Sequence, residues 1–350
     1  MKLDVLIASY QRPHLLSRTL ESLLKAPVPA GLDVHVTVIH NDEAPGTRQV
    51  VEQFDAAFDG RLHYIHERRR GKSYAINTGI HATDGDLIGL VDDDEEIDRE
   101  WYAQIVEVLS DEAVDFIGGP CLPRWGAAPP GWMPSSYRGV IGYVDDGDRV
   151  MVFGKDAPGI LMGGNAVIRR RVLQRAGDLL PTLGPRPDRR LMSGEDEDFY
   201  ARLLIAGAHG LYIPGLKIYH YVPAERLTKQ YYRRWCFWNG VSRSVIDRYR
   251  PSQVIRVGKV PRYLYGSAAR GLVRVAQSFQ GRLDPPSRFA AELAVWHLLG
   301  FVYGSYFHRA CAADGGNGGD NGNAAYAGRA MPAVEMACAI SRASDSPGRR

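Results

Sequence analysis

Cysteine is scarce in this sequence of 350 residues, and its four cysteines are scattered. Cys121, Cys236, Cys311 and Cys338 include no pair with the close spacing of a zinc-binding or redox motif. Neither a structural zinc site nor a disulfide framework is therefore indicated. Unpaired cysteines are typical of a reducing compartment, so we expect a cytoplasmic protein.

Long hydrophobic runs are also rare. The opening stretch "MKLDVLIASYQRP" contains Asp4 and lacks the apolar core of a signal peptide, so it predicts a first β-strand. The most apolar stretch, residues 289–307, is interrupted by Glu292 and His297, which a membrane-spanning helix tolerates poorly. We expect residues 289–307 to form either a core helix or a helix lying on a membrane surface.

Acidic residues are abundant in one part of the chain and scarce in the next. Residues 1–221 contain 32 Asp and Glu against 24 Lys and Arg, whereas residues 222–310 contain 4 against 15. This asymmetry predicts an acidic body that handles cations, followed by a basic, aromatic helical region that prefers an anionic partner. Residues 311–350 are rich in Gly and Asn, so we expect a low-complexity, disordered tail.

The basic region over 222–310 has no nucleic-acid recognition motif, so we expect no nucleic-acid partner. A basic surface beside an apolar helix favours peripheral contact with anionic lipids. The alternative is a helical subdomain that packs on the acidic body.

The first half of the chain alternates between two hydrophobic periods. Strands are predicted over residues 3–9, 34–40, 62–67, 87–92 and 116–120, and helices after Pro13 and over residues 47–58, 72–82 and 99–111. Alternation at this spacing indicates right-handed βαβ units, and hence an α/β fold with a mostly parallel sheet flanked by helices. Ligands bind such sheets beyond the C-terminal strand ends.

The stretch "LIGLVDDDEEIDREW", residues 87–101, ends a predicted strand in a cluster of acids. A calcium loop of the EF-hand type starting at Asp92 would need Gly and Glu where the chain has Ile97 and Ala103. A divalent cation such as Mg²⁺ or Mn²⁺, bound with a phosphate compound, would relieve the mutual repulsion of the carboxylates. Asp92 and Asp94, two apart on an extended chain, would point the same way.

A second run of acids opens the predicted helix in "GEDEDFYARLL". In a helix, Phe199, Leu203 and Ala206 would form one apolar stripe that faces inward. Helical geometry places Glu195 and Asp196 beside this stripe, with Glu197 pointing away and Asp198 to the side. Acids are favourable at any helix N-terminus, which is the simpler explanation for them. An inward-facing pair is not explained in that way and indicates a catalytic site.

Several motifs in one order carry a resemblance to a known family. They are "SYQRP", "ERRRGKSYAINTGI", "GLVDDDEEIDREW", "GGNAVIRRRVL", "GEDEDFYARLLIAG" and "YHYVPAERLT", which together span about residues 3–235. This set resembles the family 2 glycosyltransferases of the GT-A fold. The resemblance implies a Rossmann-like catalytic domain over residues 1–221 and inverting transfer from a nucleotide-diphosphate sugar, usually a UDP-sugar, with Mn²⁺ or Mg²⁺. The acceptor it implies is a glycan or a lipid-linked glycan in bacterial polysaccharide biosynthesis.

The resemblance also implies residue roles. Asp196 would be the general base, supported by Glu195, and Asp94 and His220 would bind the metal. The turn Gly163, Gly164 and Asn165 would bind the acceptor. The nucleotide would contact Ala8, Ser9, Tyr10, Arg12, Gly71, Lys72, Asp92 and Asp93. Asn41 and Asp42 are also candidates for the nucleotide, because the family often has two adjacent Asp residues at their position.

"QYYRRW", residues 230–235, resembles the Q-x-x-R-W motif of processive members but contains one extra residue. We therefore favour single addition, with Arg226 and Arg233 near the diphosphate. Two other functions compete. A sugar-phosphate nucleotidyltransferase would need a glycine-rich loop after the first strand, which "ASYQRPHLL" lacks. A non-catalytic sugar-binding or scaffold protein would not need the set Asp92, Asp94 and Asp196.

Overall fold

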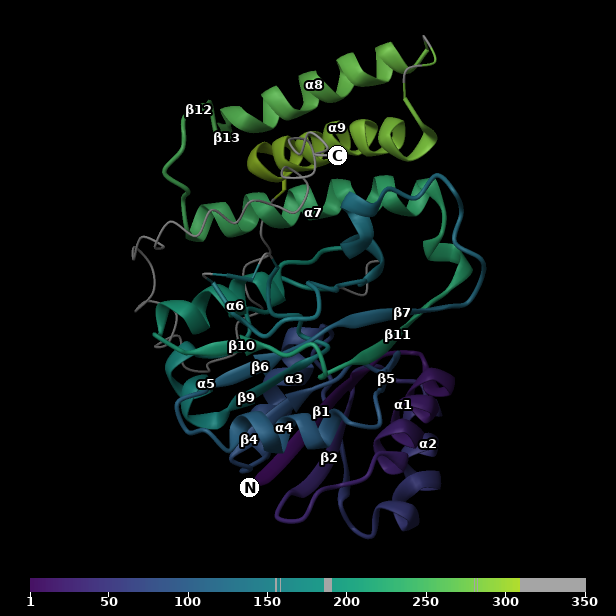
Figure 1. Ribbon diagram of the computed structural model, residues 1–350, viewed down its shortest axis with the longest axis vertical. Helices are drawn as coiled ribbons and strands as arrows, with labels where there is room; N and C mark the ends of the chain where they lie inside the picture. The colour runs from purple at the N-terminus through teal and green to yellow at the C-terminus, as the bar shows by residue number, and fades with distance from the viewer. Residues whose placement is uncertain (155, 158, 186–190, 280, 282, 309–350) are drawn as a thin grey trace.

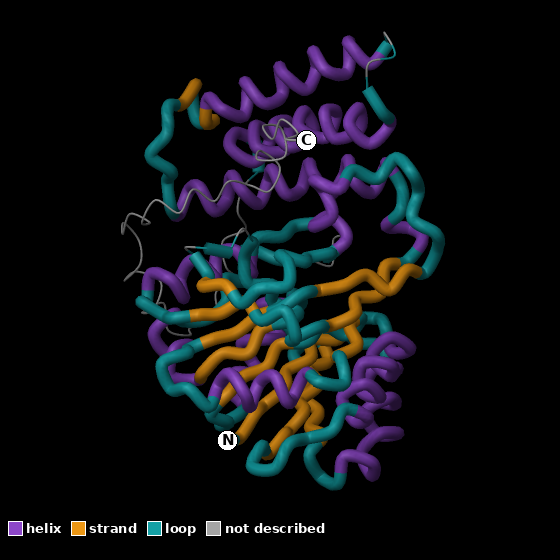
Figure 2. The backbone as a smooth tube through the Cα atoms, viewed as in Figure 1, coloured by secondary structure: helices purple, strands orange, loops and turns teal. Residues whose placement is uncertain are grey.

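The computed structural model describes residues 1–308 except 155, 158, 186–190, 280 and 282 (Figure 1). The predicted tail over 311–350 lies outside the described residues. The chain forms an α/β body, which carries a layer of helices α7, α8 and α9 at one end (Figures 1 and 2). The division into a catalytic domain over residues 1–221 and a basic helical region over residues 222–310 stays a prediction.

An eight-stranded sheet with the order β3-β2-β1-β4-β9-β6-β10-β8 forms the centre of the body. β9 and β8 run antiparallel to their neighbours, and the other strands are mutually parallel. The strands are β1 (Lys2–Ser9), β2 (Asp33–His40), β3 (Leu62–His66), β4 (Leu87–Leu90), β6 (Phe116–Gly118), β8 (Met151–Val152), β9 (Ala166–Arg169) and β10 (Gly210–Tyr212). The expected α/β fold with a mostly parallel sheet is thus confirmed.

Helices cover both faces of this sheet because side chains alternate along each strand. In β1, Leu3 and Val5 belong to a core with α1, α2 and α4, whereas Leu6 belongs to a core with α3, α5 and α6. The helices are α1 (Pro13–Lys25), α2 (Gly46–Phe54), α3 (Lys72–Ala82), α4 (Trp101–Leu109), α5 (Arg170–Ala176) and α6 (Glu195–Ile205); a 3₁₀ turn, Asp55–Phe58, follows α2. The parallel strands β1 and β2 end at the same edge, at Ser9 and His40.

A second sheet of three strands has the order β5-β11-β7. Its members are β5 (Glu95–Ile97), β7 (Cys121–Trp125) and β11 (Ile218–Val222). The run of acids after β4 thus turns and forms a strand of its own. Residues 121–160, which are rich in Gly and Pro, contain β7, β8 and a 3₁₀ turn, Ser135–Ile141.

The helical layer consists of α7 (Lys229–Tyr249), α8 (Arg262–Ser278) and α9 (Pro285–Tyr306). A 3₁₀ turn, Ala224–Arg226, precedes α7, and a hairpin of β12 (Arg256–Val257) and β13 (Val260–Pro261) precedes α8. α9, which contains the apolar 289–307 stretch, lies between α7 and α8 (Figure 1). The apolar stretch that α9 carries therefore lies in the middle of this layer, and the outer surface belongs to α8.

Glycines set the contact between α7 and α9. A Cβ atom at Gly240 would overlap the carbonyl oxygen of His297, and one at Gly300 would overlap that of Phe237. The two helix backbones therefore touch where they cross. This contact fixes α7 in position through a helix that lies about 60 residues further along the chain.

We expect Gly300→Ala to destabilise the helical layer by about 3 kcal/mol, because the added methyl group forces two backbones apart. The measurement is urea-induced unfolding followed by circular dichroism. Gly266→Ala on α8 is the matched control, because the nearest atom to its new Cβ is the mobile end of Arg270, 3.4 Å away. Equal unfolding midpoints for both variants would contradict the prediction.

Candidate active site

The acids that follow β4 form a tight turn at the edge of the central sheet. The backbone amide of Asp92 donates to Glu95 Oε2 at 2.8 Å, and the amide of Glu95 donates to the carbonyl of Asp92 at 3.2 Å. Glu95 is buried beneath the turn, and burial followed by Asp92 and Asp94 raises the pKa of Glu95 well above its usual value. A neutral Glu95 can hold the turn without adding negative charge to it.

Asp94 is buried and meets three cationic or basic groups. Its Oδ2 lies 3.3 Å from Arg226 Nη2 and 3.5 Å from His220 Nε2, and it also pairs with Arg12 Nη1. Burial opposes ionisation, but His220, Arg12 and Arg226 together lower the pKa of Asp94 far below its usual value. Asp94 is therefore an anion, although it is only 7% exposed.

Asp93 connects the same turn to the loop after β1. Its Oδ2 accepts from the backbone amide of Tyr10 at 3.1 Å, and its Oδ1 lies 3.2 Å from Arg12 Nη1. Burial raises the pKa of Asp93. Tyr10, Arg12, Asp93 and Asp94, which were predicted to act together, are indeed brought together.

Lys72, at the start of α3, faces both groups of acids. Its Nζ lies 2.8 Å from Asp92 Oδ2. Burial lowers the pKa of Lys72, but the negative charges of Asp92, Asp196 and Glu195 outweigh that effect and raise it well above the usual value. Gly71, which precedes it, has φ 141°, a conformation that favours glycine.

The first turn of α6 contributes the second group of acids. Glu195 is buried and Asp196 is partly exposed. Burial first, then Asp196, raises the pKa of Glu195 to about 8. Burial also raises the pKa of Asp196, while Lys72 opposes that shift and the backbone amide of Gly163 donates to its carboxylate.

The Gly163–Gly164 turn lies against both groups of acids. A Cβ atom at Gly163 would overlap Asp196 Oδ1, and a Cβ atom at Gly164 would overlap Glu95 Oε1. A side chain at either position would therefore have to displace the carboxylate that lies against it. The predicted role of the two glycines at the acceptor stays a prediction.

Asn165, predicted to bind the acceptor, is completely buried. Its Oδ1 accepts from Trp101 Nε1 at 3.0 Å, and its Nδ2 donates to the carbonyls of Pro120 and Leu216 at 3.1 and 2.7 Å. Because each polar atom is occupied within the core, Asn165 holds the structure together and does not reach an acceptor. The prediction for this residue is wrong.

Asn41 also has a structural role. Its amide bonds the carbonyls of Glu67 and Arg69 and the backbone amide of Gly71, at 2.8–2.9 Å. No hydrogen-bonding capacity of its Nδ2 is left for a nucleotide base, so of the two candidates we retain Asp42. Asp42 accepts from the amides of Gln11 and Ala44, both at 2.7 Å, and so holds the loop after β1.

The remaining nucleotide candidates lie at the end of β1. Ser9 is buried, and its hydroxyl lies 3.3 Å from Thr47 Oγ1. Ala8 and Tyr10 are partly exposed. Their contact with a nucleotide stays a prediction.

Two expectations for nearby residues are wrong. Glu197 does not point away from the protein but is buried under α7, where it pairs with Arg243, because the helical layer covers that side of α6. Arg233 does not approach the acidic turn; it pairs with Glu292 of α9. Arg226, in contrast, contacts both Asp94 and His220, the latter at 2.9 Å.

Two residues of the site carry only a weak signal in the sequence. Glu95 is one of six acids in the run after β4, and only its place shortly after a buried strand indicates that it is buried. Tyr231 lies in the surroundings of Arg226, Asp94 and Arg12, and burial raises its pKa. Its signal, one Tyr in "QYYRRW", was not specific.

Among the residues that the structure describes, no group of three or more His, Cys, Asp or Glu side chains is arranged to hold a metal ion. Asp94 Oδ2 and His220 Nε2, 3.5 Å apart, are the nearest approach to such an arrangement in this site. His220 Nδ1 is buried and has no hydrogen-bond partner. One carboxylate and one imidazole suit Mn²⁺ or Mg²⁺ only if phosphate oxygens and water complete the coordination.

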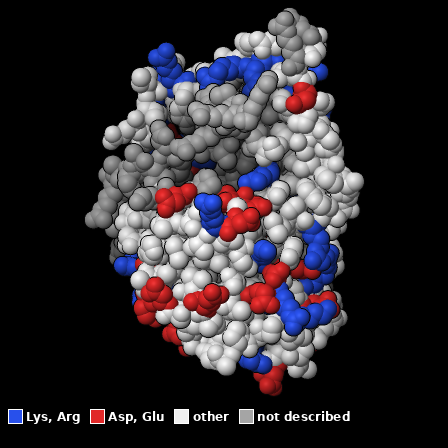
Figure 3. All heavy atoms as spheres, viewed as in Figure 1, with Lys and Arg blue, Asp and Glu red and all other residues white. Residues whose placement is uncertain are grey.

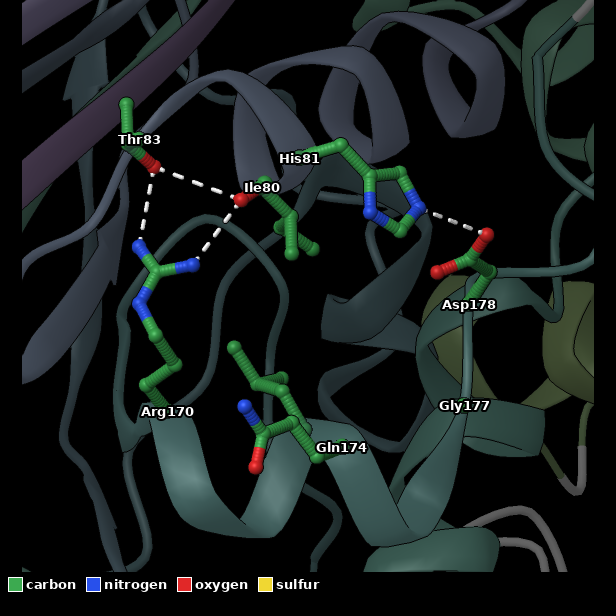
Figure 4. A pocket seen from close by; sticks show the side chains of 8 residues that line it. Ile80, His81, Thr83, Arg170, Gln174, Gly177 and Asp178 are labelled. Carbon is green, nitrogen blue, oxygen red and sulfur yellow. Dashed lines mark hydrogen bonds and ion pairs between the residues drawn. The ribbon is translucent and has the colours of Figure 1, made fainter.

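A separate cavity of about 300 Å³ lies between α3 and α5 (Figure 4). Its polar side chains bond to one another: Arg170 donates to the carbonyl of Ile80 and to Thr83, and His81 lies 3.0 Å from Asp178. None of the acids described above lines it. The cavity therefore gives no reason to place the reaction away from the acidic turn.

Comparisons with known proteins agree with this fold. The model of the family "Glycosyl transferase family 2" matches residues 4–177. Succinoglycan biosynthesis protein ExoM of Rhizobium meliloti (strain 1021) is 27% identical over 245 residues, which cover 69% of this chain and 73% of that protein. Glucosyl-dolichyl phosphate glucuronosyltransferase of Haloferax volcanii is 25% identical over 257 residues, covering 72% and 79%.

A solved structure shows the same fold. The mannosyltransferase PcManGT from Pyrobaculum calidifontis, solved in complex with GDP-Man and Mn²⁺, matches with a TM-score of 0.59 at 18% identity, over 88% of each chain. The family match covers β1 to α5, and the two relatives extend over two thirds of the chain. This chain belongs to glycosyl transferase family 2 and is a glycosyltransferase with the GT-A fold.

Proposed function

We propose that the protein transfers a sugar, with inversion, from a nucleotide-diphosphate sugar to a glycan or lipid-linked glycan acceptor. The observation that carries this proposal is the meeting of two groups of carboxylates, Asp92–Asp94 and Glu195–Asp196, with Lys72 between them. One group suits a metal-bound diphosphate and the other a base. Inverting transfer needs both, on opposite sides of the sugar that moves.

Asp196 is the proposed general base. It would take the proton from the acceptor hydroxyl as that oxygen attacks the anomeric carbon. Its raised pKa makes it a stronger base than an ordinary carboxylate, and the Gly163 amide orients it. Glu195, with a pKa of about 8, keeps its proton at neutral pH and so leaves the base role to its neighbour.

The leaving diphosphate would be held at the other group. Arg12, Arg226 and Lys72 supply fixed positive charge beside Asp92 and Asp94. A bound Mn²⁺ or Mg²⁺, held by Asp94 and His220, would neutralise the charge that develops on the diphosphate. Lys72 and the two arginines would bind and orient the same oxygens.

The relatives support this donor and acceptor class without fixing either. The Rhizobium protein is named for succinoglycan biosynthesis, and the Haloferax protein for glucuronosyl transfer to a dolichyl phosphate. We propose a UDP-sugar donor, with Asp42 beside the base, and an acceptor in polysaccharide biosynthesis. Because "QYYRRW" departs from the processive motif, we propose single addition.

We also propose that the helical layer contacts an anionic membrane at its inner face. No helix in the described part of the chain is long and apolar enough to cross a bilayer. The outer side of α8 exposes Leu272 and Val273, 58% and 56% accessible, beside the exposed side chains of Arg270 and Arg274. Exposed apolar residues interleaved with arginine are typical of a helix that lies in the lipid headgroup region.

The charge of the α8 surface favours an anionic lipid, and not an apolar protein surface, as the partner of this helix. The α8 end of the molecule shows mainly Lys and Arg on the face drawn in Figure 3, whereas Asp and Glu are frequent on the body. Within the described residues, no ion pair joins Arg270 or Arg274 to an acid. Asp284 interacts with Arg274 only through its charge, without a direct ion pair. An anionic headgroup would pair with both arginines directly.

Asp196→Asn should reduce transfer by about 10²–10⁴-fold while leaving donor affinity nearly unchanged, because only the base is lost. Transfer is followed as nucleoside diphosphate release from a panel of nucleotide sugars with Mn²⁺ and lipid-linked acceptors. Donor affinity is measured by calorimetry. Glu195→Gln is the matched control and should keep most activity, because Glu195 is already protonated.

Three outcomes would contradict the proposal in different ways. Loss of donor binding in Asp196→Asn would show that Asp196 is not the general base. Release of pyrophosphate in place of nucleoside diphosphate would indicate a nucleotidyltransferase. No turnover by the unaltered protein with any donor would favour a sugar-binding or scaffold role.

Gly163→Ala should lower kcat by about 100-fold with little change in donor affinity, because the methyl group displaces the Asp196 carboxylate. Gly139→Ala is the control, since no atom lies within 4 Å of its added Cβ. Both variants are compared in kcat and in thermal unfolding. An active Gly163→Ala enzyme would show that Asp196 need not stay where the structure places it.

For the membrane contact, the paired change Arg270→Glu and Arg274→Glu should weaken binding to phosphatidylglycerol vesicles by at least about tenfold. Flotation of the full chain with these vesicles measures the effect. Arg99→Glu on the body is the control with an equally exposed arginine. Equal capture by neutral phosphatidylcholine vesicles would contradict an anionic partner.

A further inference from the structure

The first turn of α6 bears four acids, and they divide into two pairs. Glu195 and Asp196 face Lys72 and the Gly163–Gly164 turn. Glu197 and Asp198 are both buried and contact arginines. The second pair has no part in the proposed reaction, and its partners come largely from α7.

Ionic contacts between α6 and α7 involve this second pair. Arg243 of α7 pairs with Glu197, and Arg250 Nη2, which follows α7, lies 2.9 Å from Asp198 Oδ1. Asp198 also pairs with Arg202 of its own helix at 2.9 Å. A buried ion pair with a missing partner is strongly unfavourable, so these contacts restrict how α6 can turn about its axis.

Backbone contacts fix the residues just before the base. The Oγ of Ser242, which is completely buried, accepts from the amide of Ser193 at 3.0 Å. Asn239 Nδ2 donates to Ser193 Oγ at 3.2 Å. Gly194, the residue that caps α6, has φ +99°, and a Cβ there would lie 2.9 Å from Ile246 Cδ1.

These α7 residues form one stripe. Asn239, Ser242, Arg243 and Ile246 occupy positions i, i+3, i+4 and i+7, so they lie on one side of the helix. Arg250 follows at the C-terminal cap of α7. Gly240 and Arg248 lie on other sides, toward α9: Gly240 meets His297, and Arg248 donates to the carbonyl of His308 at 3.0 Å. α7 thus contacts α6 with one side and α9 with another.

We propose that this stripe of α7, through Ser242 and Arg243, is a positioning device for Asp196. It holds the cap and first turn of α6 so that the Asp196 carboxylate stays against the Gly163 amide, in reach of an acceptor hydroxyl. Neither Ser242 nor Arg243 touches the reacting groups. The inference rests on the proposed role of Asp196 as base.

The test replaces the two positioning residues in the full-length enzyme. Ser242→Ala and Arg243→Met should each lower kcat by about 10- to 100-fold, because small displacements of a reacting group cost that much. Donor affinity, measured by calorimetry, should stay within about twofold, since the Asp92–Asp94 group is untouched. Arg243→Lys should recover most of the lost kcat, because it restores a cation beside Glu197.

Arg248→Met is the matched control. It removes an arginine of the same helix that contacts α9 and not α6, so it should affect stability without a comparable loss of kcat. In addition, Glu197→Gln combined with Arg243→Met should be no worse in kcat than Arg243→Met alone, as expected for two partners in one contact.

The results separate this inference from the proposed function. If Asp196→Asn is inactive but Ser242→Ala and Arg243→Met keep full kcat, the positioning role is wrong and the base assignment stands. If Arg248→Met lowers kcat as much as Arg243→Met, the effect is general loss of stability and the inference is overturned. If Asp196→Asn keeps full transfer, the proposed base is wrong, whatever the α7 variants do.

Discussion

Repulsion among buried carboxylates is the constraint on which this site depends, and Lys72 is the group that moderates it. Asp92 lies against the lysine, and Glu195 and Asp196 contribute to its raised pKa. Without a cation there, two groups of acids would face each other across a space with little water. The start of α3, the end of β4 and the start of α6 are thus tied to one charge.

Nearby cations and burial also decide which of the other carboxylates are ionised. Asp94 is ionised because Arg12, Arg226 and His220 surround it, whereas Glu95 and Glu195 have raised pKa values because burial leaves them short of such partners. In the proposed reaction, Mn²⁺ or Mg²⁺ would add a positive charge beside Asp94, and the diphosphate would be bound by Arg12, Arg226 and Lys72. The same arrangement distinguishes the anionic Asp94 from Glu195, whose pKa is raised to about 8.

Much of the body was predictable because local periodicity and sheet topology agree there. The β1–β4 strands and α1–α4 helices fell close to their expected bounds, and the parallel ladder places Ser9, His40 and the acidic turn at one edge. β5 was missed because Glu95–Ile97 has no apolar alternation; it is a strand only because β11 pairs with it from over 100 residues away. A strand that depends on pairing at that separation has no signal in its local sequence pattern.

The candidate site residues also include some that the sequence predicts and some that it does not. Asp92, Asp94, Lys72 and Asp196 were found because charge at a strand end or helix start is visible in the sequence. Asn165 and Asn41 were given contact with substrate, yet both are spent on backbone groups that the sequence does not pair with them. Glu197 was expected to point away from the core because helical geometry describes α6 by itself, whereas α7 covers that side of α6 and its Arg243 pairs with Glu197.

The two glycines of the 163–164 turn link positions that are far apart in the chain. Gly163 lies against Asp196, and Gly164 lies against Glu95, each without room for a methyl group. A larger residue at 163 is compatible only with a shorter one at 196, and likewise for 164 and 95. Residues 163 and 196, and likewise 164 and 95, are therefore expected to change together, because a substitution at one position of a pair alters the space left for the other.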